Sequence, residues 1–368
     1  MKKVCCLNNI SSKGTSLLGA EYELTTEMTD AEAVLVRSAS MHEMELPASL
    51  QAIARAGAGV NNIPLEKCAD QGIVVFNTPG ANANAVKELV LAGMLLSCRD
   101  IIGGVEWGRA NAENPDVAKA AEKEKKNFAG SEISGKTLGI VGLGAIGYKI
   151  AMAAMALGMD VIGYDPFLNL TDVPMTKDLK DIYEKSDFIT LHVPLLPDTR
   201  EMINKESIAM MKDGVVILNY ARDLLCNEAD LAEALESGKV RKYMCDFANP
   251  NTLAMKNTVV TPHLGASTEE SEENCAIMAV KQIRNYLENG NIINSVVFPR
   301  VDKGEKTKAV RLGVFYKDVD ALDEIKTVCG EDVLGGKRGA YGYALVDADA
   351  VDAARVAAIP GVYKVREL

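Results

Sequence analysis

The sequence predicts an α/β protein with two doubly wound parallel-sheet domains and a small C-terminal ferredoxin-like α+β domain. Two observations predict this fold class. Short β-rich runs alternate with helical stretches over roughly the first 300 residues, and residues 310–366 follow the order βαββαβ. A chain of 368 residues is also long enough for two or three domains that each bury a core.

The first domain is indicated by the alternation across segments 4–7, 33–37, 51–56 and 72–76. A long helix is expected from Asn84 to about Arg109. The polar stretch at 118–126 is interpreted as a solvated helix face or a loop.

A second α/β unit begins with a strand at 136–141 and continues through strands near 160–164, 188–191 and 215–218. One helix over 271–289, ended by Gly290, is expected to return the chain to the first domain, which 294–299 would complete. These elements predict a substrate-binding domain of residues 1–92 and 285–301 and a dinucleotide-binding domain of residues 93–284. A third domain is predicted at 306–368, after a charged linker. Its expected elements are strands at 310–316, 333–335, 341–346 and 362–366 and helices at 319–329 and 350–358.

Composition excludes several classes of protein. The longest apolar run, 89–97, is about half the length of a membrane span, and the apolar start is too short for a signal peptide. A net charge of -11 argues against a nucleic-acid partner. Eight scattered cysteines and three histidines fit neither a disulfide framework nor a metal centre, so we expect reduced thiols, no metal and a cytoplasmic location.

A glycine pattern after the strand at 136–141 carries the clearest chemistry. Gly142, Gly144 and Gly147 form Gly-x-Gly-x-x-Gly between a strand and a helix, the context of a dinucleotide-binding turn. The first glycine permits the turn, the second admits the pyrophosphate, and the third lets the helix pack closely on the strand. The alternative is a glycine-rich turn without a ligand.

Asp165 follows the next strand, eighteen residues after Gly147. A carboxylate at this distance can accept hydrogen bonds from both ribose hydroxyls and would repel a 2′-phosphate, which predicts NAD rather than NADP. The alternative is an Asx cap of the Tyr-Asp-Pro turn.

Taken together, several motifs resemble, in order and spacing, the D-isomer-specific 2-hydroxyacid dehydrogenases, and within that family the phosphoglycerate dehydrogenases. The segments that carry the resemblance over residues 1–300 are 36–38, 55–62, 77–80, 142–147, 164–166, 192–195, 219–222 and 262–268.

The resemblance implies roles for individual residues. His263 would be the acid/base and Arg222 would hold the substrate carboxylate, although the two glycines that usually follow this arginine are Asp223 and Leu224 here. A structural histidine is the alternative for His263. Asp246 would hold the nicotinamide carboxamide, and the other implied cofactor positions are Thr78, Ala145, Ile146, His192, Val193, Tyr220, Ala221, Leu264, Gly265 and Ala266.

For the substrate, backbone N–H groups around Ala58, Gly59 and Val60 are expected to bind a carboxylate as an anion nest. Arg37, with the adjacent Ser38, and Arg55 are candidates for a phosphate group. Surface ion pairs are the alternative interpretation of both arginines.

One departure concerns the partner of the histidine. The family places a glutamate before a proline here, whereas this chain reads Asp246-Phe-Ala-Asn249-Pro250. Asn249 is the nearest substitute and is predicted to orient His263, with Glu269 as an alternative carboxylate.

The last sixty or so residues resemble an ACT domain, a regulatory module that binds amino acids. The loop at 316–321 lacks the family's usual ligand-binding residues, so the resemblance implies a degenerate module.

The resulting functional prediction is oxidation of 3-phospho-D-glycerate by NAD to 3-phosphohydroxypyruvate, the first step of serine biosynthesis, by a homodimer or higher homo-oligomer. The alternatives are a dehydrogenase or reductase of another 2-hydroxy or 2-keto acid such as glyoxylate, or an NAD-sensing binding protein. Intact Arg222 and His263 argue against the last of these.

Overall fold

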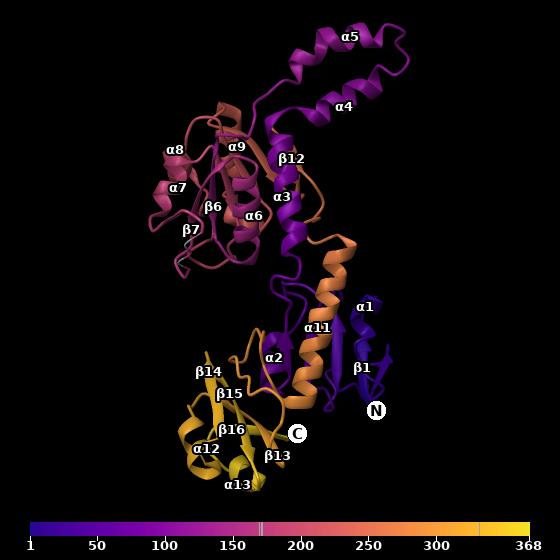
Figure 1. The fold of residues 1–368 in the computed structure, drawn as a ribbon, viewed down its shortest axis with the longest axis vertical. Coiled ribbons are helices and arrows are strands. Elements are labelled where there is room, and N and C mark those ends of the chain that lie inside the picture. Colours follow the sequence, from indigo (N-terminus) through magenta and orange to yellow (C-terminus); the bar gives the residue numbers. More distant parts are fainter. Residues whose placement is uncertain (169, 171, 331) are drawn as a thin grey trace. The chain divides into compact units, whose positions relative to one another are not determined.

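The computed structural model describes residues 1–168, 170, 172–330 and 332–368. The chain divides into two compact units, one of residues 1–82 with 269–368 and one of residues 83–268 (Figure 1). These divisions differ from the expected ones at 92/93 and 284/285. The helix after Asn82 lies wholly in the second unit, and the long helix that begins at Glu269 lies wholly in the first.

The first unit contains a five-stranded parallel sheet in the order β2-β1-β3-β4-β5. Its strands are β1 (Lys2–Cys6), β2 (Tyr22–Thr25), β3 (Ala33–Val36), β4 (Ala52–Arg55) and β5 (Val74–Phe76). The associated helices are α1 (Ser12–Thr15), α2 (Leu65–Asp70) and α11 (Glu269–Asn289). Both faces of the sheet are covered, which is why β3 and β5 are wholly buried and continuously apolar.

The second unit contains a seven-stranded parallel sheet in the order β12-β11-β10-β9-β6-β7-β8, a doubly wound arrangement. Its strands are β6 (Thr137–Val141), β7 (Asp160–Tyr164), β8 (Met175–Thr176), β9 (Phe188–Leu191), β10 (Val215–Asn219), β11 (Val240–Cys245) and β12 (Thr258–Val260). Its helices are α3 (Ala83–Cys98), α4 (Ile101–Ala110), α5 (Val117–Glu124), α6 (Ala145–Ala156), α7 (Leu179–Lys185), α8 (Lys205–Met210), α9 (Glu228–Ser237) and α10 (Pro250–Ala254), with 3-10 turns at Lys125–Asn127 and Asp223–Leu225.

The long helix expected over 84–109 is two helices, α3 and α4. The break falls at Arg99 and Asp100, because the Asp100 side chain accepts from the N–H of Gly103 and so begins a new helix. No residue of α4 or α5 is buried. The prediction of one helix failed because apolar residues continue at helical spacing across the break. The Asp100 cap that separates the two helices leaves no mark on that spacing.

The C-terminal segment has the predicted βαββαβ order. Its elements are β13 (Val310–Lys317), α12 (Leu322–Cys329), β14 (Val333–Arg338), β15 (Tyr341–Ala348), α13 (Ala353–Ala357) and β16 (Val362–Glu367). The strand order β14-β15-β13-β16, with antiparallel pairs throughout, is that of a ferredoxin-like sheet.

This small sheet is buried on both faces. One face packs under α12 and α13 through residues such as Val314 and Ile325. The other face joins the core of the parallel-sheet domain, where the rings of Phe315 and Phe298 are 5.2 Å apart. The C-terminal segment is therefore fixed to the rest of the first unit.

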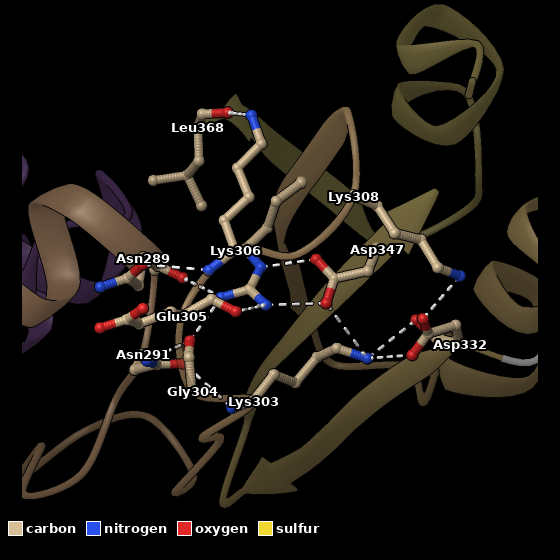
Figure 2. Close-up of polar contacts among 12 residues, drawn as sticks. Asn289, Asn291, Lys303, Gly304, Glu305, Lys306, Lys308, Asp332, Asp347 and Leu368 are labelled. Carbon is tan, nitrogen blue, oxygen red and sulfur yellow. Dashed lines mark hydrogen bonds and ion pairs between the residues drawn. The ribbon is translucent and has the colours of Figure 1, made fainter. Parts of the chain in front are cut away.

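A buried ion pair joins the linker, the end of α11 and the C-terminal sheet (Figure 2). The fully buried Arg311 donates from Nε and Nη2 to the two oxygens of Asp347, at 2.5 and 2.7 Å. Its remaining N–H groups reach the backbone oxygens of Asn289, Gly304 and Glu305. Every donor direction of this guanidinium is used, as a buried charge requires.

Over the part of the chain that the structure describes, no helix is long and apolar enough to cross a membrane. The same residues contain no group of three or more histidine, cysteine or acidic side chains placed to hold a metal ion. All eight cysteines are free thiols.

Candidate active site

The loops after β3 and β4 meet at the carboxyl edge of the first unit's sheet. In a sheet of this order, ligands bind where the strand order reverses, here between β1 and β3. Arg37 and Ser38 follow β3, and Arg55 ends β4. Nε of Arg55 donates to the Arg37 carbonyl at 3.1 Å, and its guanidinium lies against Gly57. The Arg55 side chain therefore reaches the backbone of Arg37.

The predicted anion nest at residues 58–60 is tied to the end of β5. Nδ2 of Asn77 donates to the Ala58 carbonyl at 2.7 Å, and the N–H of Thr78 donates to the Gly57 carbonyl at 3.0 Å. Ala58, Gly59 and Val60 are half-buried. Thr78 Oγ1 is buried without a hydrogen-bond partner among the described residues, so it is one polar group that a ligand could satisfy.

Asn8 lies outside every motif of the sequence, yet it organises the loop after β3. Its Oδ1 accepts from three successive backbone N–H groups, those of Arg37 at 2.8 Å and of Ser38 and Ala39 at 3.1 Å. Asn8 follows β1, so it sits at the reversal of strand order. A lone asparagine after a strand gives no signal of this role in the sequence.

Arg37 has an acidic partner in the first turn of α11. Its Nη2 lies 2.6 Å from Oε1 of Glu272, and both side chains are partly exposed. The surface ion pair considered for Arg37 therefore exists, on the same edge of the sheet as the candidate phosphate site.

In the second unit, the predicted glycine turn joins β6 to α6. Gly142 has φ +92° and lies against the His192 carbonyl, where a Cβ atom would come within 2.5 Å. A Cβ on Gly147 would come within 2.0 Å of the Gly142 carbonyl, whereas a Cβ on Gly144 would meet nothing within 4 Å. Gly142 and Gly147 thus allow close packing, and Gly144 leaves open space. Ala145 and Ile146 form the first turn of α6, beside that space.

The Asp165 carboxylate lies beside this glycine turn. Oδ2 accepts from the N–H of Leu143 and Oδ1 from that of Phe167, both at 2.9 Å. The second bond is the Asx turn considered above. Each oxygen keeps a second lone pair, so the carboxylate is held in place and can still accept hydrogen bonds from ribose hydroxyls.

His192 and Val193 follow β9, next to β6 at the reversal of strand order in this sheet. Nε2 of His192 lies 2.8 Å from the Thr190 hydroxyl, and Nδ1 is buried without a partner among the described residues. Burial lowers the pKa of His192 to about 3, so the imidazole is neutral near pH 7. A neutral ring beside the glycine turn fits the predicted lining role.

The loop after β10 contains Tyr220, Ala221 and the exposed Arg222. Asn219 holds it, since its Nδ2 donates to the Arg222 carbonyl at 2.8 Å and its Oδ1 accepts from the Ala221 N–H at 3.2 Å. The Tyr220 ring is buried in the core against Gly93 of α3, so its side chain serves packing. Asp223 and Leu224, which replace the usual glycines, begin a 3-10 turn.

His263 lies beside Asp246, at the end of β11. Nδ1 of His263 is 3.7 Å from Oδ2 of Asp246, whose side chain is fully buried. The N–H of Gly265 donates to the same oxygen at 3.0 Å, while Oδ1 has no partner among the described residues. Burial raises the pKa of Asp246, and the nearby His263 and backbone N–H groups oppose that rise. The adjacent Ala266 is half-buried.

Asn249 does not contact His263, so its predicted role as the histidine's partner is wrong. Its Oδ1 accepts from the N–H groups of Asn251 and Thr252 and begins α10, and its Nδ2 donates to Glu228 at 2.7 Å. The prediction failed because a helix cap claims the side chain. The carboxylate beside His263 is that of Asp246, which the family resemblance places at the nicotinamide carboxamide.

The geometry fits a nicotinamide dinucleotide. The open space at Gly144, the N-terminus of α6 and Asp165 match a pyrophosphate and a ribose, and the buried unpaired Oδ1 of Asp246 suits an amide N–H donor. The second unit therefore defines a dinucleotide-binding protein with a histidine and an arginine at the carboxyl edge of the same sheet.

Comparison with known proteins agrees with this class. The family described as D-isomer specific 2-hydroxyacid dehydrogenase, NAD binding domain, matches residues 91–265. A hydroxypyruvate reductase of Thermotoga maritima is 42% identical over 274 residues, 71% of this chain and 86% of that protein. A D-3-phosphoglycerate dehydrogenase of Methanocaldococcus jannaschii is 38% identical over 294 residues, 76% of this chain and 54% of that protein.

Among solved structures, an NAD+-bound 3-phosphoglycerate dehydrogenase of Entamoeba histolytica aligns with a TM-score of 0.65 at 28% identity, over 80% of this chain and 98% of that one. The chain belongs to the D-isomer-specific 2-hydroxyacid dehydrogenase family, and its second unit is the NAD-binding domain of that family. The chain spans about half the length of the phosphoglycerate dehydrogenase of M. jannaschii.

Proposed function

We propose that the protein oxidises 3-phospho-D-glycerate with NAD to 3-phosphohydroxypyruvate, the entry reaction of serine biosynthesis. The observation that carries the substrate assignment is the pair Arg37 and Arg55 at the carboxyl edge of the first sheet, joined by the 3.1 Å bond from Arg55 Nε to the Arg37 carbonyl. Guanidinium groups beside backbone N–H groups are suited to a phosphate and a carboxylate.

In this proposal His263 takes the hydroxyl proton during oxidation and returns it during reduction. Because Nδ1 faces Asp246, Nε2 is the nitrogen left for the substrate. Asp246 orients the ring, the task expected above of Asn249. The glycine turn at 142–147 and Asp165 would hold NAD, which would supply the hydride acceptor for C2 of the substrate.

Arg222 is assigned to the substrate carboxylate, which it would grip with its guanidinium fork. Its backbone is held by Asn219, so the loop is fixed although the usual glycines are absent. The N–H groups at Ala58, Gly59 and Val60 are assigned to an anionic group of the substrate.

Reduction of an unphosphorylated keto acid, such as hydroxypyruvate or glyoxylate, is the second candidate. Two observations favour it: the relative at 42% identity is a hydroxypyruvate reductase, and the charge of Arg37 is paired with Glu272. A purely NAD-sensing binding protein would need neither Arg222 nor His263.

Steady-state kinetics of the purified protein separate these functions. We expect 3-phosphoglycerate to be oxidised with NAD at a kcat/KM at least tenfold above that of D-glycerate. Equal turnover of the two would contradict a phosphate site, and preferential reduction of hydroxypyruvate over 3-phosphohydroxypyruvate would support the second candidate. If the protein turns over no hydroxy or keto acid, the result would support an NAD-sensing binding protein.

The proposal also covers the oligomeric state, the cellular location and the C-terminal segment. We propose a homodimer or higher homo-oligomer in the cytoplasm, without nucleic-acid or membrane partners, and a C-terminal segment that is a degenerate ACT module. The free thiols agree with a reducing compartment, and burial raises the pKa of the Cys68 thiol to about 12, which keeps it unreactive.

A further inference from the structure

The first turns of α11 carry several carboxylates, and two of them have different basic partners. Glu272 pairs with Arg37, with 2.6 Å between Oε1 and Nη2, whereas Glu273 pairs with Lys13 at the same distance. Glu272 and Glu273 are neighbours in one helix turn, but only Glu272 contacts the arginine assigned to the substrate phosphate, and it is the more exposed of the two.

Glu272 uses a donor that a phosphate would use. A guanidinium binds carboxylate and phosphate oxygens through the same N–H groups, so Nη2 of Arg37 cannot serve both fully. The Arg37 side chain is 39% exposed and that of Glu272 is 42% exposed. An anion from solution can reach this pair, and an exposed ion pair is weak enough to be displaced.

The surrounding loop is fixed, so the competition takes place at a defined position. Asn8 holds the backbone of residues 37–39 through three hydrogen bonds, and Arg55 holds the Arg37 carbonyl. The Arg37 guanidinium and the Glu272 carboxylate are therefore the groups that must rearrange when a phosphate arrives.

We infer that Glu272 is an internal competitor of the substrate phosphate at Arg37, and that it determines how strongly phosphorylated hydroxy acids are preferred over unphosphorylated ones. The inference rests on the proposed phosphate site. A doubly charged phosphate ester displaces Glu272 and is then repelled by the freed carboxylate. D-Glycerate has no group to place there and is unaffected.

The test compares Glu272→Gln with Glu273→Gln. Both variants remove one negative charge from the same turn of α11, but only the first frees Arg37. The readouts are KM and the dissociation constant of 3-phosphoglycerate, the latter from ligand-induced thermal stabilisation, which needs no turnover. Inorganic phosphate and D-glycerate are measured in parallel.

We expect Glu272→Gln to lower the KM and the dissociation constant for 3-phosphoglycerate about threefold to tenfold, the scale of one exposed ion pair released and one repulsive charge removed. The dissociation constant of inorganic phosphate should fall in the same way. The KM for D-glycerate and the kcat should not change. Glu273→Gln should bind like the native protein. In an Arg37→Met background the gain from Glu272→Gln should shrink to the part that comes from removing the repulsive charge, because the competition for Nη2 requires both side chains.

Equal effects of the two glutamine variants, or a gain that is undiminished in the Arg37→Met background, would overturn the inference alone. If Arg37→Met leaves the affinity for 3-phosphoglycerate unchanged, the phosphate site itself is wrong, and both the inference and the proposed substrate fall with it.

Discussion

Nδ1 of His263 lies 3.7 Å from Oδ2 of Asp246, an exposed imidazole against a fully buried carboxylate. The contact assigns the two ring nitrogens different tasks, since one faces the protein and the other is left for the substrate. The Phe247 ring, whose centroid is 5.3 Å from that of the imidazole, restricts the ring further. A single short segment from Asp246 to Phe247 therefore positions the imidazole proposed as the acid/base.

The Asp246→Asn variant tests this relationship through the kcat of keto-acid reduction. Without the carboxylate beside Nδ1 the imidazole loses the group that orients it, so we expect kcat to fall about tenfold or more. The control is Asn249→Ser, which keeps a cap for α10 and should leave kcat unchanged. A fall in the serine variant without one in Asp246→Asn would restore Asn249 as the partner.

Cofactor preference is predicted to depend on Asp165. Replacing it with Asn removes the charge but retains an oxygen that can hold one of the two backbone N–H groups. We expect kcat/KM with NAD to fall and the NAD/NADP preference to relax by about tenfold or more, because a ribose 2′-phosphate no longer meets a like charge. Efficiency measured with both cofactors decides this, and an unchanged ratio would remove Asp165 from the ribose site.

Asn8 is predicted to position the substrate loop. In Asn8→Ala, three backbone N–H groups after β3 lose their common acceptor, so we expect KM for 3-phosphoglycerate to rise about fivefold or more while kcat changes little. Asn9→Ala, at the exposed neighbouring position, is the control. If the two variants behave alike, the loop does not depend on Asn8.

Much of the fold follows from local patterns in the sequence. The glycine turn, the strands on either side of it and the C-terminal βαββαβ order depend on residues close together in the chain, where apolar periodicity and turn chemistry operate. The break at Asp100 does not follow from the pattern, because the apolar spacing is continuous there and a single capping side chain ends one helix and begins the next.

The candidate site was less predictable where partners are distant in sequence. Arg37 was selected, but its contacts with Asn8 and Glu272 arise only when β1, β3 and α11 come together. Likewise, Asn249 was chosen for its place beside a proline, although that same place makes it a helix cap. Residue type and spacing identify which groups carry charge, and the folded chain decides which groups they meet.

The buried pair Arg311 and Asp347 should dominate the stability of the C-terminal segment. Asp347→Asn leaves a fully buried guanidinium without its counter-charge and should lower the free energy of unfolding by about 3–5 kcal/mol. Replacing both residues with apolar ones, as in Arg311→Met with Asp347→Leu, should recover most of that loss. Urea denaturation of the three proteins measures this. A single variant as stable as the native protein would show that water reaches the arginine.

The ion pairs around Asp332 should make the C-terminal segment sensitive to acid. Lys303 and Lys308 contact this carboxylate and lower its pKa to about 2. Because the pKa is lowered on folding, the stabilising effect is complete above the unfolded value near 4 and is lost as the pH falls through about 2.

Thermal unfolding between pH 5 and pH 2 checks this prediction. The native melting temperature should fall over that interval, and Asp332→Asn should remove part of the fall because its side chain no longer titrates. The charge-matched control is Glu367→Gln, an exposed position of the same segment, which should follow the native curve. Parallel curves for the native protein and Asp332→Asn would show that the lysines do not stabilise the ionised carboxylate in the folded state.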